Sequence, residues 1–365
     1  MLYDHKCEQM YSFSLPLLVA VTLRLAGRCP SLYCRPNPCE RITLGVPGLL
    51  GLCGALLLIL FVPMAAMAAQ EEDTSAGGWF GDIQAGGGVI SSRPSGLEVF
   101  DDNARLDSVA DEGARQSEGL GLITGEIGYA FKNSGTTLLV GGGMNDPLHL
   151  SLGREGDGWG PVTLSALYKR EKVWKNPYLI EVDRDETDAE SIGYSLAWDN
   201  ILHSGLGVYF AQMHIDIKQD LIGQLQPDLQ RDGIDTTLEL NYAFQLGAGG
   251  VLRAGVSYVR IERDGGGNSG NGYAAELNHL LEWRRFSFAT DLEFMATEFD
   301  EIHPVFDKKR EEAGVSIFET VSLAEPFGLD NFYLFGIAGY SGTDAELTFF
   351  DSSGFVAATG VGYRF

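Results

Sequence analysis

The last thirteen residues, Ser353–Phe365, read SGFVAATGVGYRF and alternate strictly along the chain. One set of alternate positions carries Phe355, Tyr363 and the C-terminal Phe365, and the other set is mostly small. Because successive side chains of a strand point to opposite faces, the pattern predicts a strand with one apolar face. Chain termini fray unless something holds them, so the terminal phenylalanine needs either a protein core or a lipid bilayer around it.

The same period of two recurs along most of the chain, as in TTLELNYAF (236–244) and FSFATDLEF (286–294), and no helical stripe of useful length follows residue 78. About fourteen strands are predicted, or twelve if the weakest pair is left out. The weakest pair is 136–142 and 147–153. The predicted spans are 79–90, 118–131, 136–142, 147–153, 161–173, 188–199, 205–217, 236–245, 250–262, 272–283, 286–299, 312–323, 332–340 and 354–365.

The connections between these strands alternate in length. Every second connection is tight, for example KNSG (132–135) and the Arg-Arg pair at 284–285. The intervening connections are mostly long and polar, and they span 91–117, 174–187, 218–235, 263–271 and 300–311. Short turns on one rim and long loops on the other are typical of an outer-membrane barrel with both termini on the periplasmic side.

Alternation alone does not tell which face is inside, but three features favour lipid on the outside. The apolar face carries aromatic residues near strand ends, as an interfacial girdle does: Trp79, Tyr168, Trp198, Tyr258, Trp283, Tyr340 and Tyr363. The opposite face carries too many charges to pack dry inside a sheet. The strands also have the ~9–11 residues needed to cross a bilayer. The predicted fold is an all-β, transmembrane, antiparallel β-barrel.

The first 69 residues differ from the rest and are interpreted as a leader that contains a signal peptide. The run 49–62 is almost wholly apolar, and small residues that fit a cleavage site near Ala68 or Ala69 follow it. A spanning helix is the alternative, but it needs ~20 apolar residues and this run is shorter. All five cysteines lie in the leader, so residues 70–365, the predicted barrel, contain none.

The composition excludes some classes of function. The leader holds five basic and three acidic residues, which leaves 21 of 26 basic and 47 of 50 acidic residues in the rest of the chain, a formal charge near −26. Such a chain repels nucleic acid. High charge also accompanies disorder, but aromatic and β-branched residues run evenly through this chain.

Four stretches resemble one protein family. KNPYLIEVDRDETD (175–188), AWDNILHSGLGV (197–208), HPVFDKKREEAGVSIFE (303–319) and the segment 331–365 are similar to the domain-of-unknown-function family numbered 2860, which consists of exported proteobacterial proteins. The resemblance implies an outer-membrane barrel and supplies neither an activity nor catalytic residues. The family usually has Asn where this chain has His303, which argues against a special role for this histidine.

Two sets of polar residues are candidates for a functional site. The first set faces away from the apolar side of its strands and is predicted to line a wet lumen: Glu239, Asn241, Arg253, Glu276, Asn278, Asp291 and Glu293. The second set follows a proline in each of three long loops and pairs a basic with an acidic residue: Arg184 with Asp185, Arg231 with Asp232, and Arg310 with Glu311. These pairs either form a ring of alternating charge at the outer mouth or lock the loops to one another through Arg–carboxylate contacts.

No enzyme, metal or cofactor is predicted. The acidic run 181–190 lacks the glycine and the terminal glutamate spacing of a calcium loop. The glycine-rich stretches are not followed by a helix or a lysine, so they are interpreted as turns. His279 falls on the predicted lipid face, and a one-residue bulge would turn it inward. The last strand resembles the C-terminal signal by which the barrel-assembly machinery recognises outer-membrane barrels, through Val361, Tyr363 and Phe365.

These features lead to three hypotheses. The first is a porin-like outer-membrane channel for small hydrophilic solutes, with a preference for cations and with the acidic loop 91–117 folded inward. The second is a non-conducting surface protein whose loops bind a partner or an envelope polymer. The third is a barrel hydrolase that uses His303 and His214. The expected partners are outer-membrane lipid, lipopolysaccharide, the assembly machinery and the solutes, and the sequence leaves homo-oligomers open.

Overall fold

A computed structural model describes residues 77–365 apart from 101–102, 111–112, 144–146, 157 and 248. The predicted leader, 1–69, therefore lies outside the described residues. The strands are β1 (Gly78–Arg93), β2 (Gln116–Phe131), β3 (Thr136–Gly142), β4 (Leu148–Arg154), β5 (Val162–Trp174), β6 (Glu186–Trp198), β7 (Leu206–Ile217), β8 (Gly233–Gln245), β9 (Gly250–Arg263), β10 (Gly270–Trp283), β11 (Phe286–His303), β12 (Lys308–Ala324), β13 (Phe332–Ala345) and β14 (Ser352–Arg364).

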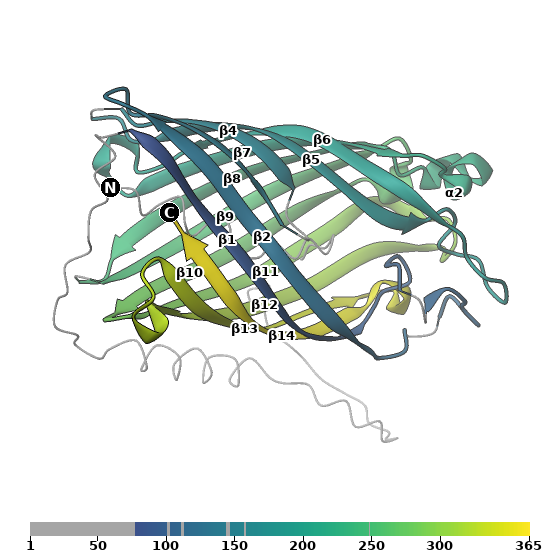
Figure 1. The fold of residues 1–365 in the computed structure, drawn as a ribbon. Coiled ribbons are helices and arrows are strands. Elements are labelled where there is room, and N and C mark those ends of the chain that lie inside the picture. The colour runs from purple at the N-terminus through teal and green to yellow at the C-terminus, as the bar shows by residue number, and fades with distance from the viewer. Residues whose placement is uncertain (1–76, 101–102, 111–112, 144–146, 157, 248) are drawn as a thin grey trace, which may run out of the picture.

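These strands form one closed antiparallel barrel in which each strand pairs with its neighbours in the sequence (Figure 1). The barrel closes between β1 and β14, where Asp82 pairs with Arg364, and the backbones of Gly81 and Phe365 exchange two hydrogen bonds. The prediction of an all-β antiparallel barrel of fourteen strands is thereby confirmed, including the weak pair β3 and β4. Closure leaves no sheet edge at this seam, which a barrel in lipid requires.

The two rims of the barrel differ in the length of their connections, and we call them the turn end and the loop end. Connections at the turn end have two to seven residues, whereas three at the loop end, 94–115, 175–185 and 218–232, have eleven or more. Two connections predicted to be long, 263–271 and 300–311, are reduced to 264–269 and 304–307 because the flanking strands extend into them. Several strands reach farther toward the loop end than predicted: β11 continues to His303, β12 begins at Lys308 and β13 continues to Ala345. The alternation is lost there because neither face contacts lipid, so the sequence pattern ends before the strand does.

The outer surface carries the belt of a transmembrane barrel. Leu240 and Phe294, both on the predicted lipid face, are exposed, as are the large apolar residues at alternate positions of nearly every strand. All seven aromatic residues predicted for the girdle are exposed: Trp79, Tyr168, Trp198, Tyr258, Trp283, Tyr340 and Tyr363. Because such a surface would aggregate in water, its natural environment is hydrocarbon.

One prediction about the outer face is wrong. His279 falls on the lipid face in the sequence pattern, and a one-residue bulge was expected to turn it inward. In the structure β10 stays in register, with His279 opposite Thr290 of β11, and Thr290 donates a 2.6 Å hydrogen bond to Glu319 of β12. These three residues form a polar row among the lipid-facing positions. The register shift of this region lies instead between Glu298 and Ile302.

The inner face has an apolar wall as well as a polar one. Tyr333, Phe335 and Ile337 of β13 point inward and cluster with Leu122 of β2 and Ala358 of β14. Glycines make room for these side chains: a Cβ atom on Gly360 would lie 2.4 Å from the ring of Phe335, and one on Gly362 would lie 2.0 Å from the ring of Tyr333. The rings therefore lie flat against the neighbouring strand, as aromatic side chains do over glycine in curved sheets.

Gly360→Val is expected to destabilise the barrel, because its side chain would also meet the Ala85 carbonyl oxygen at 2.4 Å. Overpacking of this kind costs about 1–3 kcal/mol of unfolding free energy. Gly336→Val is the matched control, since a Cβ atom there meets nothing closer than 4.0 Å. The midpoint of urea unfolding in detergent should fall for the first variant and not for the second. Equal midpoints would contradict this account of the wall.

Candidate functional site

Polar residues of β8 to β11 gather on one side of the lumen. All seven residues predicted to line the lumen lie at inward-facing positions of these strands: Glu239, Asn241, Arg253, Glu276, Asn278, Asp291 and Glu293. Glu276 pairs directly with Glu293 across β10 and β11, and one row away Asn278 pairs with Asp291. Four carboxyl groups and one guanidinium thus share this surface, which we call the acidic wall.

Hydrogen bonds hold several of these side chains in place. Asn278 Nδ2 donates to Asp291 Oδ1 at 2.9 Å, and Asn241 Nδ2 donates to Glu239 Oε1 at 2.8 Å. Asn241 and Arg253 are only 4 % and 8 % exposed. The acidic wall is therefore an ordered surface against which a cation can be partly desolvated.

Loops from opposite sides of the barrel meet across the loop end. The loop after β5 leads into β6, and β6 lies seven strands from β13 in the fourteen-stranded barrel. Tyr178 of this loop nevertheless packs on Phe349 in the loop after β13, with the centroids of the two aromatic rings 5.1 Å apart. Phe306, in the loop after β11, lies 6.0 Å from Tyr178. Leu106, in the loop after β1, joins the same buried cluster.

We call these segments the loop cap: the described residues of 94–115 together with 175–185, 304–307 and 346–351. Its aromatic centre reaches across the mouth of the barrel, because its members come from loops on opposite sides of the loop end. The loop 94–115, predicted to fold inward, contributes Leu106 to this centre and pairs with the loop after β5 through a bridge between Arg105 and Asp183.

Arg184 ties the two sides of the loop cap together. Its guanidinium donates to the carbonyl oxygens of Gly96 (2.7 Å), Pro177 (2.8 Å) and Asn103, and it lies 4.3 Å from the ring of Trp174. Burial lowers the pKa of this arginine to about 10, so it remains charged at neutral pH. Asp185, the acidic residue beside it in the sequence, is exposed and lies 3.6 Å from Lys175.

The other two predicted loop pairs also find different partners. Arg231 contacts Asp220 at 2.6 Å, whereas Asp232 accepts a hydrogen bond from the Ile217 N–H. Arg310 pairs with Glu312 rather than Glu311, and it stacks on Phe350 with its guanidinium carbon 3.7 Å from the ring centroid. All three arginines lock loops, but each through residues that the local sequence does not single out.

His303 is fully buried beneath the loop cap, outside the membrane-spanning part of β11. Its Nδ1 accepts a hydrogen bond from the Val305 N–H at 3.3 Å, so Nε2 carries the proton and donates to the Tyr178 hydroxyl at 2.9 Å. Desolvation lowers the pKa of His303 to about 3, with nearby Arg310 acting in the same direction. The imidazole of His303 is therefore neutral at neutral pH when the loop cap is folded.

The pKa of Glu98, in the loop after β1, is shifted upward, whereas that of His303 is shifted downward. Burial raises its pKa to about 7, although its carboxylate accepts a 2.6 Å hydrogen bond from the Ser95 N–H. His303 contributes stability that is complete above pH 6.5 and is lost as the pH falls toward 3. Glu98 contributes stability that is complete below pH 4.5 and is lost as the pH rises through 7.

These opposed titrations predict how cap stability depends on pH. In Glu98→Gln the titration of His303 is opposed by one carboxyl group fewer, because only Glu312, whose pKa burial also raises to about 7, remains. Protection of the Gly96 and Glu181 amides from hydrogen exchange should therefore fall, relative to the wild type, as the pH decreases below 6.5. In His303→Asn the same protection should rise as the pH falls from 7 to 4.5. The wild type should lie between the two variants. Identical pH profiles in all three proteins, after correction for intrinsic exchange, would contradict these assignments.

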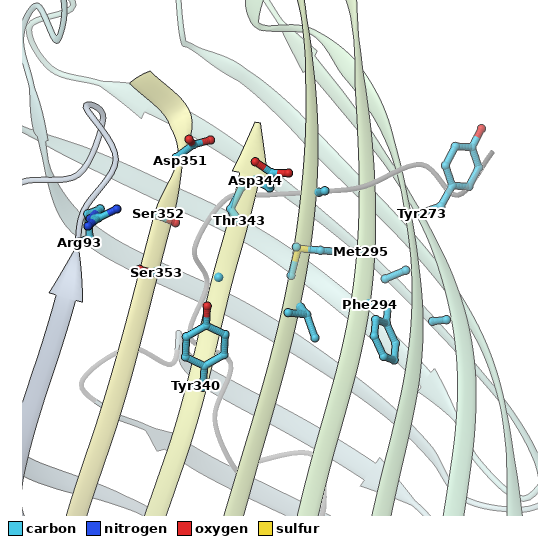
Figure 2. A pocket seen from close by; sticks show the side chains of 16 residues that line it. Arg93, Tyr273, Phe294, Met295, Tyr340, Thr343, Asp344, Asp351, Ser352 and Ser353 are labelled. Atoms are coloured by element: carbon cyan, nitrogen blue, oxygen red, sulfur yellow. The ribbon is translucent and has the colours of Figure 1, made fainter. Parts of the chain in front are cut away.

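An apolar groove of about 1030 Å³ lies outside the lumen, over β10 to β14 (Figure 2). Tyr273, Phe294 and Tyr340 border it, and small residues such as Ala313 and Gly342 line it. Arg93, Asp344 and Asp351 lie at its loop end, as Figure 2 shows. An apolar floor below polar groups is suited to the acyl chain and headgroup of a lipid.

The C-terminal residues take part in barrel closure. Val361, Tyr363 and Phe365 are all exposed on the outer face at the turn end, and the rings of Tyr363 and Phe365 stack 6.0 Å apart. No helix among the described residues is long and apolar enough to cross a membrane. The described part of the chain also holds no group of three or more His, Cys, Asp or Glu side chains placed to bind a metal ion.

A family model described as "Protein of unknown function (DUF2860)" matches residues 78–364. No curated protein matches the chain. Among solved structures, a loop-deletion mutant of the outer-membrane protein OmpT of Vibrio cholerae is 10% identical, covering 80% of this chain and 100% of its own, with a TM-score of 0.39. A Pseudomonas aeruginosa FadL homologue is 11% identical, covering 78% and 90%, with a TM-score of 0.38.

The anion-selective porin of Comamonas acidovorans is similar at 9% identity, with 79% of this chain and 99% of the porin covered and a TM-score of 0.38. At such identities and TM-scores the likeness carries no argument about function. The function has to come from the geometry of the chain itself.

Proposed function

Because the chain belongs to the DUF2860 family, whose description assigns no function, we propose from its geometry that it is an outer-membrane channel for small hydrophilic solutes with a preference for cations. The acidic wall carries this proposal. Ionisable side chains at membrane depth are retained where they line a water-filled cavity. Glu239, Glu276, Asp291 and Glu293 point into the barrel between lipid-facing belts, so the lumen holds water.

The preference for cations follows from the balance of charge on the acidic wall. Four carboxyl groups face the lumen there, against the single guanidinium of Arg253. Rings of carboxylates favour cations in other channels. The barrel size fits small solutes, since eight strands fill with side chains and sixteen to eighteen leave a wide channel. A barrel of fourteen strands is intermediate in width between these two cases.

We place the loop end on the outside of the cell and both termini in the periplasm. The short connections at one rim and the long ones at the other support this orientation. In this orientation the loop cap faces the medium, and Phe365 lies at the periplasmic interface. Export by a signal peptide within residues 1–69 is part of the same proposal.

The packed loop cap also favours the second hypothesis, a non-conducting surface protein. A buried aromatic cluster reaches across the mouth, and such a cluster would obstruct an axial path while it stays folded. The hydrolase hypothesis has less support, because His303 is fully buried and His214 pairs with Ile192 on the outer face of the wall. The two histidines do not share a surface.

Recordings from the purified, folded chain in planar bilayers test the proposal. We expect conductance steps and, in a KCl gradient, a reversal potential of the sign for cation selectivity. A folded barrel, recognised by its anomalous migration without heating, that never produces a step would overturn the channel and leave the surface protein. Stepwise conductance that selects anions would overturn the role of the acidic wall.

A further inference from the structure

The barrel wall is incomplete between β2 and β5. The hairpin of β3 and β4 between them has only seven residues in each strand, whereas β2 has 16 and β5 has 13. On the side of β3, β2 pairs only over Gly125–Phe131, so among the described residues 116–124 have strand partners in β1 alone. Likewise β5 pairs with β4 only up to Tyr168.

The unpaired edges bound a gap in the hydrogen-bonded wall of the barrel. Nine residues of strand extend over about 30 Å. In Figure 1, β2 and β5 diverge from the turn end toward the loop end, with the short hairpin between them at the narrow end. Only five residues separate Gly142 from Leu148, so the hairpin is too short to pair along the rest of β2.

The loop cap closes the gap at its top. The loop after β1 crosses to the loop after β5, where Arg105 pairs with Asp183 and the Trp174 indole donates to the Glu98 carbonyl oxygen at 2.8 Å. The gap in strand pairing is therefore bordered by β2, β5, the short hairpin and the loop cap, and we call it the window. It is separate from the mouth that the aromatic cluster of the cap covers.

The outer surface beside the window changes from apolar at its lower border to charged farther toward the loop end. The lower border of the window carries exposed apolar side chains, including Ile123 (76 % exposed), Val140 and Leu148. Farther along β5 the outer face becomes charged, with Arg170 bound to Asp188 at 2.7 Å. Unpaired backbone groups at an edge cannot remain in hydrocarbon, so those of residues 116–124 need water or a polar ligand.

Behind the window the lumen is apolar on the near side. Leu122 belongs to the unpaired part of β2 and also packs with Tyr333, Phe335 and Ile337 in the apolar wall. The acidic wall lies across the lumen, since β9 is seven strands from β2 in the ring of fourteen. Glu118, an exposed residue at an inward position of the same edge, adds a carboxylate at the window.

We propose that the window between β2 and β5 is a lateral portal through which small cationic amphiphiles pass between the outer leaflet of the membrane and the lumen. The apolar chain slides along Leu122 and the apolar wall, and the cationic head binds the backbone edge, Glu118 and then the acidic wall. This route uses the proposed orientation but does not need ion flux, because the loop cap stays folded.

Photolabelling of the full mature chain in liposomes tests the portal. The probe is a dodecylamine that carries a diazirine on its chain, and labelled positions are mapped by mass spectrometry. We expect label on the inward residues Leu122, Phe335 and Ile337 as well as on lipid-facing Phe294. Label confined to outward residues would overturn the portal.

Gly119→Trp/Gly121→Trp is the blocking variant, because a Cβ atom at either glycine has no neighbour within 4 Å and the indoles can extend over the window. It should reduce inward label at least about fivefold relative to Phe294, since an apolar path is interrupted. Gly336→Trp, which faces lipid on β13, should leave inward label unchanged. Equal loss in both variants, or no loss in the blocking variant, would contradict entry through the window.

Conductance of the same variants separates the portal from the proposed channel. If the blocking variant loses inward label and keeps the wild-type conductance, the two routes are distinct. If wild-type protein conducts without inward label, the portal fails and the channel stands. If inward label occurs in a protein that never conducts, the channel fails and the portal stands.

Discussion

Arg184→Ala is expected to open the loop end and raise the ion current through the barrel. The substitution leaves the carbonyl oxygens of Gly96, Pro177 and Asn103 without their donor inside a buried site. Each buried group left unsatisfied costs about 1–3 kcal/mol. A total near 3 kcal/mol shifts the equilibrium between closed and open cap by about two orders of magnitude, since 1.4 kcal/mol is tenfold.

Single-channel recordings in planar bilayers measure this effect as open probability. Arg105→Ala is the matched control, because Arg105 is an exposed arginine of the same loop cap that meets Asp183 through the backbone. It should behave as the wild type. Arg184→Lys should lie between the two, because an ammonium keeps the charge but cannot donate to three separated carbonyl oxygens.

An unchanged open probability in Arg184→Ala would show that the cap does not limit conduction. Migration without heating must first show that the barrel itself has folded. Since Arg184 lies in the loop cap and not in a strand, loss of the barrel is not expected from this change.

Neutralising the acidic wall is expected to reverse the ion selectivity. With Glu239→Gln, Glu276→Gln, Asp291→Asn and Glu293→Gln together, Arg253 remains as the charged group of this surface. Carboxylates that line a narrow water-filled passage raise the local concentration of cations, and an unopposed guanidinium raises that of anions. We expect the permeability ratio of K⁺ to Cl⁻ to fall about tenfold and to pass below one.

Reversal potentials in a KCl gradient measure this ratio. The double variant Glu276→Gln/Glu293→Gln removes the pair that faces across β10 and β11, and it should give an intermediate ratio if the fourfold variant folds poorly. Glu186→Gln is the control, because this carboxylate is exposed on the outer side at the loop end. A ratio unchanged in the double variant would remove the acidic wall from the conduction path.

The sequence predicted the outer face of the barrel with few errors because that information is local. Leu240 and Phe294 were assigned to lipid from their neighbours two residues away, and the structure exposes both. His279 was misjudged because a polar residue on a lipid face looks like an error of register. The partners that explain it, Thr290 and Glu319, lie on two other strands.

The partners of the loop arginines could not be predicted from the sequence. Each was paired in the sequence with the acid beside it, yet Arg231 binds Asp220 and Arg310 stacks on Phe350. Long side chains in folded loops choose partners by spatial packing, and a neighbour in sequence often points the other way. Buried His303 and the hydrophobic centre of the loop cap left no periodic signal that could have revealed them.

By itself the sequence determined the class of fold and which side chains meet lipid, since a period of two encodes the two faces of a strand wherever one face is apolar. It left twelve or fourteen strands open, and the structure decided for fourteen. Only the tertiary structure decided that loops pack across the mouth, that the lumen has an apolar wall and that strand pairing is interrupted between β2 and β5. Those features depend on strand register and on contacts between segments on opposite sides of a closed ring. A local sequence pattern specifies neither the strand register nor these long-range contacts.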